Sequence, residues 1–176
     1  FCDLHLKEYY TRIGEVIPRE KLEQILLTGG KNKYRTELLK LFHDTLIGFA
    51  HKVRAAVDTV DPTIRVGACT HQTWDLHGTD PLEIAKAFAG KTKPFTRIAG
   101  APFRNPDIIP ILENSRQQCA WGKNSDVEMF SEGDTFPRPR IRIPSKPMEL
   151  FDLMLCADGC TDGILAYVEC YDNKPD

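Results

Sequence analysis

The chain has 176 residues, of which 41% are hydrophobic and 27% are charged, a composition typical of one globular domain with a substantial core. Its formal net charge of −2 gives no reason to expect nucleic acid or an anionic membrane surface as a partner. No apolar run approaches the roughly 18 residues that a membrane span requires.

The first third of the chain is predicted to be mainly helical. Residues 1–30 are expected to form a loop and a short helix, which starts at Pro18 and is broken by Gly29 and Gly30. Apolar residues three and four positions apart then predict one long helix from Tyr34 to Val60, ended by the pair Asp61-Pro62. The residues of this apolar stripe are Leu38, Phe42, Leu46, Phe49, Val53, Val57 and Val60.

The rest of the chain repeats a strand followed by a helix. Strands are predicted to start near Ile64, Phe95, Val127 and Ile164, which lie 31, 32 and 37 residues apart. Helices are predicted between them, over 80–91, 108–121 and 145–158. These spacings are typical of βα units. Because the strands are apolar without strict alternation, they predict a parallel sheet that is buried on both faces.

Two architectures suit such a repeat, an open doubly wound sheet and part of a (β/α)8 barrel. The doubly wound fold normally carries a glycine-rich phosphate loop after its first strand, and this sequence has none there. In a barrel, functional residues gather at the carboxyl ends of the strands. The sequence therefore favours the partial barrel.

Polar and aromatic residues follow every predicted strand at its carboxyl end, whereas the amino ends carry ordinary connectors such as "VDPT" and "GKTK". The first strand is followed by His71, Trp74, Asp75 and His77, and the second by Phe103, Arg104 and Asn105. The third ends at Ser131, Glu132 and Asp134, and the fourth at Glu169, Tyr171, Asp172 and Asn173. This asymmetry predicts a site at the carboxyl ends.

Carboxylates beside aromatic rings suit carbohydrate, because rings pack on the apolar face of a sugar while acids and amides bind its hydroxyl groups. A retaining glycosidase needs two carboxyl groups about 5–5.5 Å apart, one to protonate the leaving oxygen and one to attack. Glu132 is the candidate for the attacking group, because a strand delivers it and Gly133 permits a sharp turn immediately afterwards. Arg138 or Arg140 is expected to keep it ionised.

The segment "FSEGDTFPRPR", followed by the helix "PSKPMELFDLMLCADG", resembles a known family. It is similar to the later half of β-galactosidase-like (β/α)8 glycoside hydrolases, in the clan whose acid/base lies on the fourth strand and whose nucleophile lies on the seventh. In that register "RVGACT", "FTRIAGA", "VEMFSE" and "ILAYVEC" correspond to strands five to eight. The resemblance implies a retaining hydrolase of β-linked sugars with Glu132 as its catalytic nucleophile.

The expected fold is one partial barrel over residues 1–176, with a loop and helices in 1–60 and βα units five to eight in 61–176. A complete barrel takes about 250 residues, and the position of the family's acid/base has no counterpart in this chain. The chain alone is therefore expected to be inactive. Its expected partners are a carbohydrate substrate and either the missing amino-terminal half of the barrel or another copy, paired through the exposed sheet edges.

The candidate substrate-binding residues are His71, Trp74, Arg104, Asp134, Glu169 and Tyr171. Trp74 is either a platform for a sugar or an apolar cover for the barrel mouth. Arg104 binds a substrate hydroxyl group or pairs with Asp107. Glu169 and Tyr171 are two residues apart on a strand and so point the same way.

No metal or cofactor is predicted. His71 and His77, with Asp75 between them, lack a third ligand at a suitable spacing. Of the six cysteines only Cys156 and Cys160 lie close together, so reduced and mostly buried thiols are expected.

Two other functions remain open. The first is a catalytically silent carbohydrate-binding or assembly fragment, which follows from the missing half of the barrel. The second is a barrel enzyme of other chemistry, such as an aldolase or isomerase. That chemistry prefers a lysine at a strand end, and the strand-end loops offer only Lys174, close to the last residue of the sequence.

Overall fold

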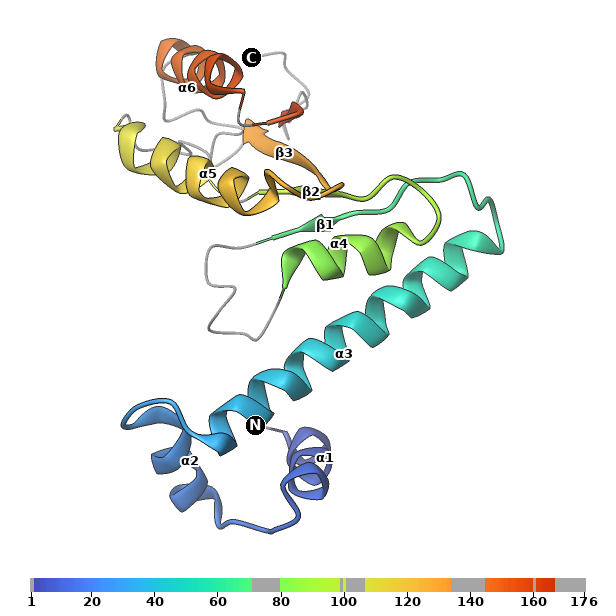
Figure 1. Ribbon diagram of the computed structural model, residues 1–176, viewed down its shortest axis with the longest axis vertical. Coiled ribbons are helices and arrows are strands. Elements are labelled where there is room, and N and C mark those ends of the chain that lie inside the picture. Colours follow the sequence, from blue (N-terminus) through green and yellow to red (C-terminus); the bar gives the residue numbers. More distant parts are fainter. Residues whose placement is uncertain are drawn as a thin grey trace, which may run out of the picture. The chain divides into compact units, whose positions relative to one another are not determined.

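The computed structural model describes residues 2–70, 80–98, 100, 107–133, 145–159 and 161–166 (Figure 1). The chain divides into two compact units. One, called here the helical unit, comprises Phe1–Phe49 and Thr73–Asp80, and the other, the sheet unit, comprises Ala50–Gln72 and Pro81–Asp176. The expectation of a single domain over the whole chain remains a prediction, because the relative placement of the two units is not defined.

The helical unit contains α1 (Asp3–Ile13), α2 (Arg19–Leu27) and the first part of α3 (Lys33–Asp58). Their apolar sides share one core, made of Leu6, Tyr9, Ile17, Leu22, Leu26, Leu38 and Leu41. The prediction for α2 is confirmed, and Pro18 directly precedes the helix. α1 was not predicted from the sequence, because this helix buries only Leu6 and Tyr9 and its apolar pattern is correspondingly weak.

Two side chains close the turn between α2 and α3. Asn32 accepts a hydrogen bond from the backbone N–H of Arg35 through Oδ1 (2.9 Å) and donates through Nδ2 to the carbonyl of Ile25 (3.0 Å). Arg35 donates through Nε to the carbonyl of Leu26 (2.9 Å). A cation at the carboxyl end of α2 satisfies carbonyl groups that the helix leaves open and complements its dipole.

The predicted long helix over 34–60 is confirmed as α3, which continues into the sheet unit. The predicted apolar stripe is buried at Leu38 but exposed at Val60, which lies beyond the end of the helix at Asp58. In the sheet unit, buried Arg54 anchors the helix: its Nη1 donates to the carbonyl of Ile64 (2.7 Å), and its Nη2 lies 2.8 Å from Asp58 Oδ1.

The described residues of the sheet unit form four parallel strands, β1 (Ala68–Cys69), β2 (Phe95–Arg97), β3 (Glu128–Gly133) and β4 (Gly163–Ala166) (Figure 1). They lie side by side in chain order, β1-β2-β3-β4. The connecting helices are α4 (Pro81–Ala89), α5 (Ile109–Gly122) and α6 (Ser145–Asp158). The predicted parallel α/β repeat is therefore confirmed, although β1, within the first predicted strand, is only two residues long.

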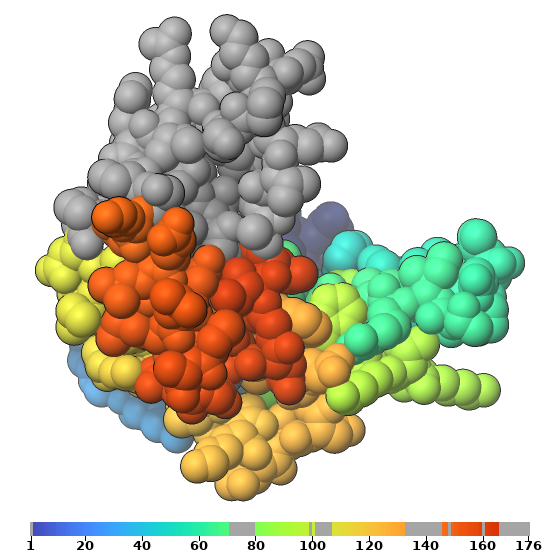
Figure 2. Space-filling model, turned by 90° about the horizontal axis from the view of Figure 1, so that it is seen from above, coloured from blue at the N-terminus to red at the C-terminus, as the bar shows by residue number. Residues whose placement is uncertain are grey.

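One face of the sheet is covered by helices. Side chains alternate along a strand, and Ile98 and Met129 on this face pack with Ala85 of α4 and Cys119 of α5. In a second cluster, Leu112 of α5 packs with Phe151 and Leu155 of α6. α5 therefore contacts both the sheet and α6, and α6 lies at the surface of this unit (Figure 2).

The opposite face of the sheet carries Phe95 and Arg97 on β2 and Glu128, Phe130 and Glu132 on β3, and we call it the aromatic face. Its two phenylalanine rings meet edge to face, with centroids 5.7 Å apart. Glycines flank this pair: a Cβ on Gly67 would lie 2.6 Å from the Phe95 ring, and one on Gly163 would lie 2.9 Å from the Phe130 ring. The neighbouring strands therefore need glycine where the large rings lie.

The structure also bears on the predictions made for Gly159 and for the cysteines. Gly159, predicted to lie just beyond the last helix, follows α6 in a left-handed conformation (φ 60°). The described cysteines Cys2, Cys69, Cys119 and Cys156 are free thiols, but only Cys119 is buried, so the expectation of mostly buried thiols is wrong for the other three. Within the described ranges, no helix is long and apolar enough to cross a membrane, and no group of three or more His, Cys, Asp or Glu side chains is placed to bind a metal ion.

Candidate functional site

Glu132 lies on β3, one residue before the strand ends, as the sequence predicted. It is buried, with a side chain only 9% exposed. Across the sheet, its neighbour on β4 is Leu165, which offers no charge. Among the described strands, β2 supplies the cation that Glu132 contacts.

The partner is Arg97, whose Nη1 donates a hydrogen bond to Glu132 Oε1 and forms an ion pair with it. The register of β2 and β3 places Arg97 beside Phe130, so Glu132 follows two residues later on the same face. A long guanidinium side chain spans that offset. Arg138 and Arg140, the partners expected from the sequence, lie outside the described residues.

Sequence reasoning missed Arg97 although a partial signal was present. Alternation along the predicted strand puts Arg97 on the same side as Phe95. The register between β2 and β3 decides which residue of β3 lies beside Arg97. A shift of one residue in that register would turn Glu132 to the other face of the sheet. The pairing could not be assigned without the tertiary structure.

The carboxylate of Glu132 is held through one oxygen only. Within the described part of the chain, no residue donates a hydrogen bond to Oε2. Arg97 is also only partly satisfied, because its buried Nε has no hydrogen-bond partner there. A charged hydrogen bond of this type is strong and directional, so the geometry fixes Oε1 and leaves Oε2 available.

Glu128, at the amino end of the same face, is paired differently. Lys93 Nζ lies 2.6 Å from its Oε1, and Arg65 donates through Nη2 to its Oε2. Lys93 and Arg65 together hold the pKa of the Glu128 carboxyl below its usual value. Arg65 also lies over the Phe95 ring, 4.9 Å from its centroid. Both oxygens of Glu128 are therefore occupied.

The aromatic face thus has three layers along the strand direction. The Glu128 cluster lies at the amino end, the Phe95–Phe130 pair lies in the middle, and the Arg97–Glu132 pair lies at the carboxyl end. The other predicted site residues lie outside the described residues, and their placement is not tested: His71, Trp74, Arg104, Asp134, Glu169 and Tyr171.

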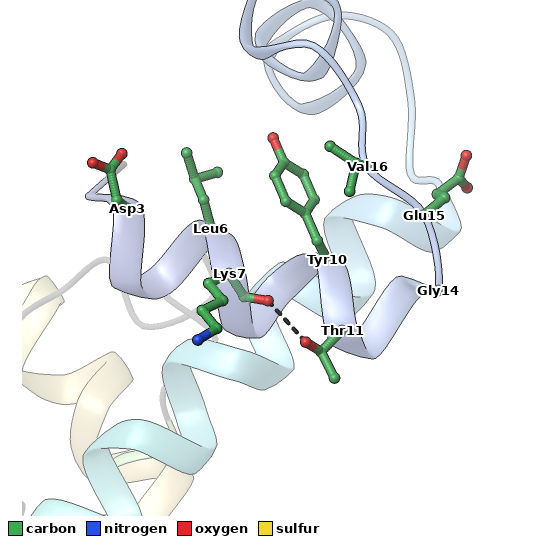
Figure 3. Close-up of a pocket in the computed structure, with 8 residues that line it drawn as sticks. All are labelled: Asp3, Leu6, Lys7, Tyr10, Thr11, Gly14, Glu15 and Val16. Carbon is green, nitrogen blue, oxygen red and sulfur yellow. Dashed lines mark hydrogen bonds between the residues drawn. The ribbon is translucent and has the colours of Figure 1, made fainter.

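Two cavities lined by described residues lie away from Glu132. One of about 660 Å³ runs along α1 in the helical unit, where Leu6, Tyr10 and Val16 project into the same space (Figure 3). Another, of about 570 Å³, lies in the sheet unit at the amino ends of the strands and is lined by charged residues such as Lys93 and Asp162. Neither cavity lies at the carboxyl ends of the strands.

Comparison of the chain with protein-family models, with curated proteins and with solved structures found no significant match. An interpretation of function therefore depends on the site itself.

Proposed function

We propose that the sheet unit is the second half of a (β/α)8 barrel, comprising strands five to eight. The strand order supports this proposal, because it follows the chain without reversal, whereas a doubly wound sheet reverses its order at a switch point. Right-handed crossovers in an unreversed sheet place all connecting helices on one face, and α4 and α5 share such a face. In a closed barrel the aromatic face would be the interior.

We propose further that the protein is a retaining glycoside hydrolase acting on β-linked sugars, with Glu132 as its nucleophile. The observation that carries this proposal is a buried carboxylate at the carboxyl end of β3, with one oxygen bound by Arg97 and the other bound by none of the described residues. In the reaction, a Glu132 oxygen forms an ester bond to the anomeric carbon while the leaving-group oxygen departs with a proton from an acid. Water then hydrolyses the ester, and the anomeric configuration is retained.

The acid must come from another part of the barrel. Among the described carboxyl ends of the strands, Glu132 is the only carboxylate, and the family resemblance places the acid/base on the fourth strand. The active unit in this proposal is the intact barrel, formed with the amino-terminal half or with a second copy at the edges β1 and β4. His71, Trp74, Arg104, Asp134, Glu169 and Tyr171 remain proposed sugar contacts, and this chemistry requires no cofactor.

A mechanism-based label tests the proposal in the natural full-length protein. The probes are 2,4-dinitrophenyl 2-deoxy-2-fluoro-β-glycosides of glucose, galactose and mannose. Dinitrophenolate leaves without protonation, and the fluorine slows hydrolysis of the ester, so the covalent intermediate accumulates. We expect a mass increase of one fluorosugar, mapped by peptide sequencing to Glu132.

The Glu132→Gln variant is expected to take up no label and to lose turnover of aryl β-glycosides. Labelling of another carboxylate in the wild-type protein, or wild-type turnover by the Glu132→Gln variant, would contradict the assignment.

A second candidate function is a non-catalytic carbohydrate-binding fragment. It follows from the family resemblance, which places the acid/base on a strand with no counterpart in this chain, because hydrolysis needs two carboxyl groups. Calorimetric titration of this chain with β-linked oligosaccharides distinguishes the two functions. Saturable binding without hydrolysis, by this chain and by the full-length protein alike, would favour the binding function.

A further inference from the structure

We infer that Arg97 is a positioning residue that selects Oε2 of Glu132 as the attacking oxygen. This inference rests on the proposed function and goes beyond it, because it names the group that orients the nucleophile. Arg97 binds Oε1 from the neighbouring strand. An oxygen whose lone pair already accepts a charged hydrogen bond is the poorer nucleophile, so attack falls to the oxygen that the described residues leave unoccupied.

The backbone holds Arg97 in place on both sides. Its carbonyl accepts hydrogen bonds from the N–H of Thr70 (3.0 Å) and from Thr70 Oγ1 (3.1 Å), which tie β2 to the end of β1. On the other side, the N–H of Ile98 donates to the carbonyl of Phe130 (2.8 Å), which ties β2 to β3. The guanidinium therefore extends from a backbone that is fixed relative to Glu132, as orientation of a reacting group requires.

The chemistry of arginine makes this role specific. The guanidinium is planar and presents its donors in a fixed fork, whereas the ammonium of lysine is a point charge on a flexible stem. Arg97→Lys thus keeps the positive charge beside Glu132 and removes the directional constraint. A role limited to charge balance would tolerate lysine, and a positioning role would not.

The matched control is Arg65→Lys. Arg65 is an arginine at the same face and bonds a glutamate of the same strand, but at the amino end of that strand. The experiment measures inactivation of the full-length protein by the dinitrophenyl fluorosugar that labels Glu132. It yields two quantities for the wild type and for each variant: the maximal inactivation rate constant and the half-saturating probe concentration.

We expect Arg97→Lys to lower the maximal rate constant about 100-fold, the effect of a small misplacement of a reacting group. The half-saturating concentration is expected to stay close to the wild-type value. Arg65→Lys is expected to leave both quantities unchanged. Circular dichroism and thermal unfolding verify that each variant is folded, and Arg97→Lys is preferred to Arg97→Met because it does not leave Glu132 without a cation.

Two results would overturn the inference. A wild-type maximal rate constant in Arg97→Lys would show that the guanidinium does not orient Glu132. A raised half-saturating concentration with an unchanged maximal rate constant would assign Arg97 to sugar binding instead. If the proposed function itself is wrong, the wild-type protein will carry the label on another residue or on none. This result is distinct from both results above.

Discussion

Two glutamates on one face of β3 are paired in opposite ways. Glu128 has both oxygens bound, by Lys93 and Arg65, whose side chains are 62% and 40% exposed. Glu132 has one oxygen bound, by Arg97, whose side chain is only 19% exposed. The Glu128 side chain is itself only 18% exposed, so it differs from Glu132 in having both oxygens bound and in having cations that reach solvent, where ion pairs contribute little to stability. A buried carboxylate with one oxygen that no described residue binds is costly to desolvate, and this contrast supports the proposal that Glu132 is the reacting group.

The sharpest test of this comparison is the loss of stability when each arginine is removed. Arg97→Met leaves the charge of Glu132 buried without a partner and is expected to lower the free energy of unfolding by about 3–5 kcal/mol. Arg65→Met leaves Lys93 on Glu128 and is expected to cost no more than about 1 kcal/mol. Urea unfolding at pH 7 measures both. Equal losses in the two variants would remove the distinction between the two ends of the strand.

The aromatic pair between the two ends gives a smaller effect. Gly67→Ala places a methyl group 2.5 Å from the backbone carbonyl oxygen of Phe95 and 2.6 Å from its ring, and is expected to destabilise the protein by about 1–3 kcal/mol. Gly48→Ala, in the middle of α3 with no atom within 4 Å of the new Cβ, is the matched control and is expected to stabilise by about 0.5–1 kcal/mol. Thermal unfolding measures the change in stability of each variant relative to the wild type. A neutral Gly67→Ala would mean that β1 and the Phe95 ring are not held together as described.

The smallest expected effect is the pH dependence of the Glu128 cluster. Because Lys93 and Arg65 lower the pKa of this carboxyl in the folded state, the cluster stabilises the protein above the unfolded-state pKa of about 4.3. That contribution disappears as the pH falls through the lowered pKa. Glu128→Gln should therefore be less stable than the wild type at pH 7, and the difference should shrink towards pH 2. A difference in urea unfolding that is the same at both pH values would argue against the cluster.

Much of the fold was predictable because it depends on local pattern. The starts of β2, β3 and β4, the three helices between the strands and the length of α3 follow from the spacing of apolar residues and from breakers such as Gly159. The sequence also located Glu132 correctly at the end of a strand. Local information failed at α1, where Leu6 and Tyr9 are the only fully buried side chains. It also failed for the exposed thiols, because the exposure of Cys69 depends on what covers the sheet.

The amino-acid sequence alone determined the order of βα units and the place of Glu132 at a strand end, because helix and strand periodicity are properties of neighbouring residues. Only the tertiary structure decided which cation each glutamate contacts. Arg97 and Glu132 lie 35 positions apart, and Arg65 and Glu128 lie 63 apart. These pairs are formed by the register between parallel strands, which is set by packing across the whole sheet and is not encoded in any short segment.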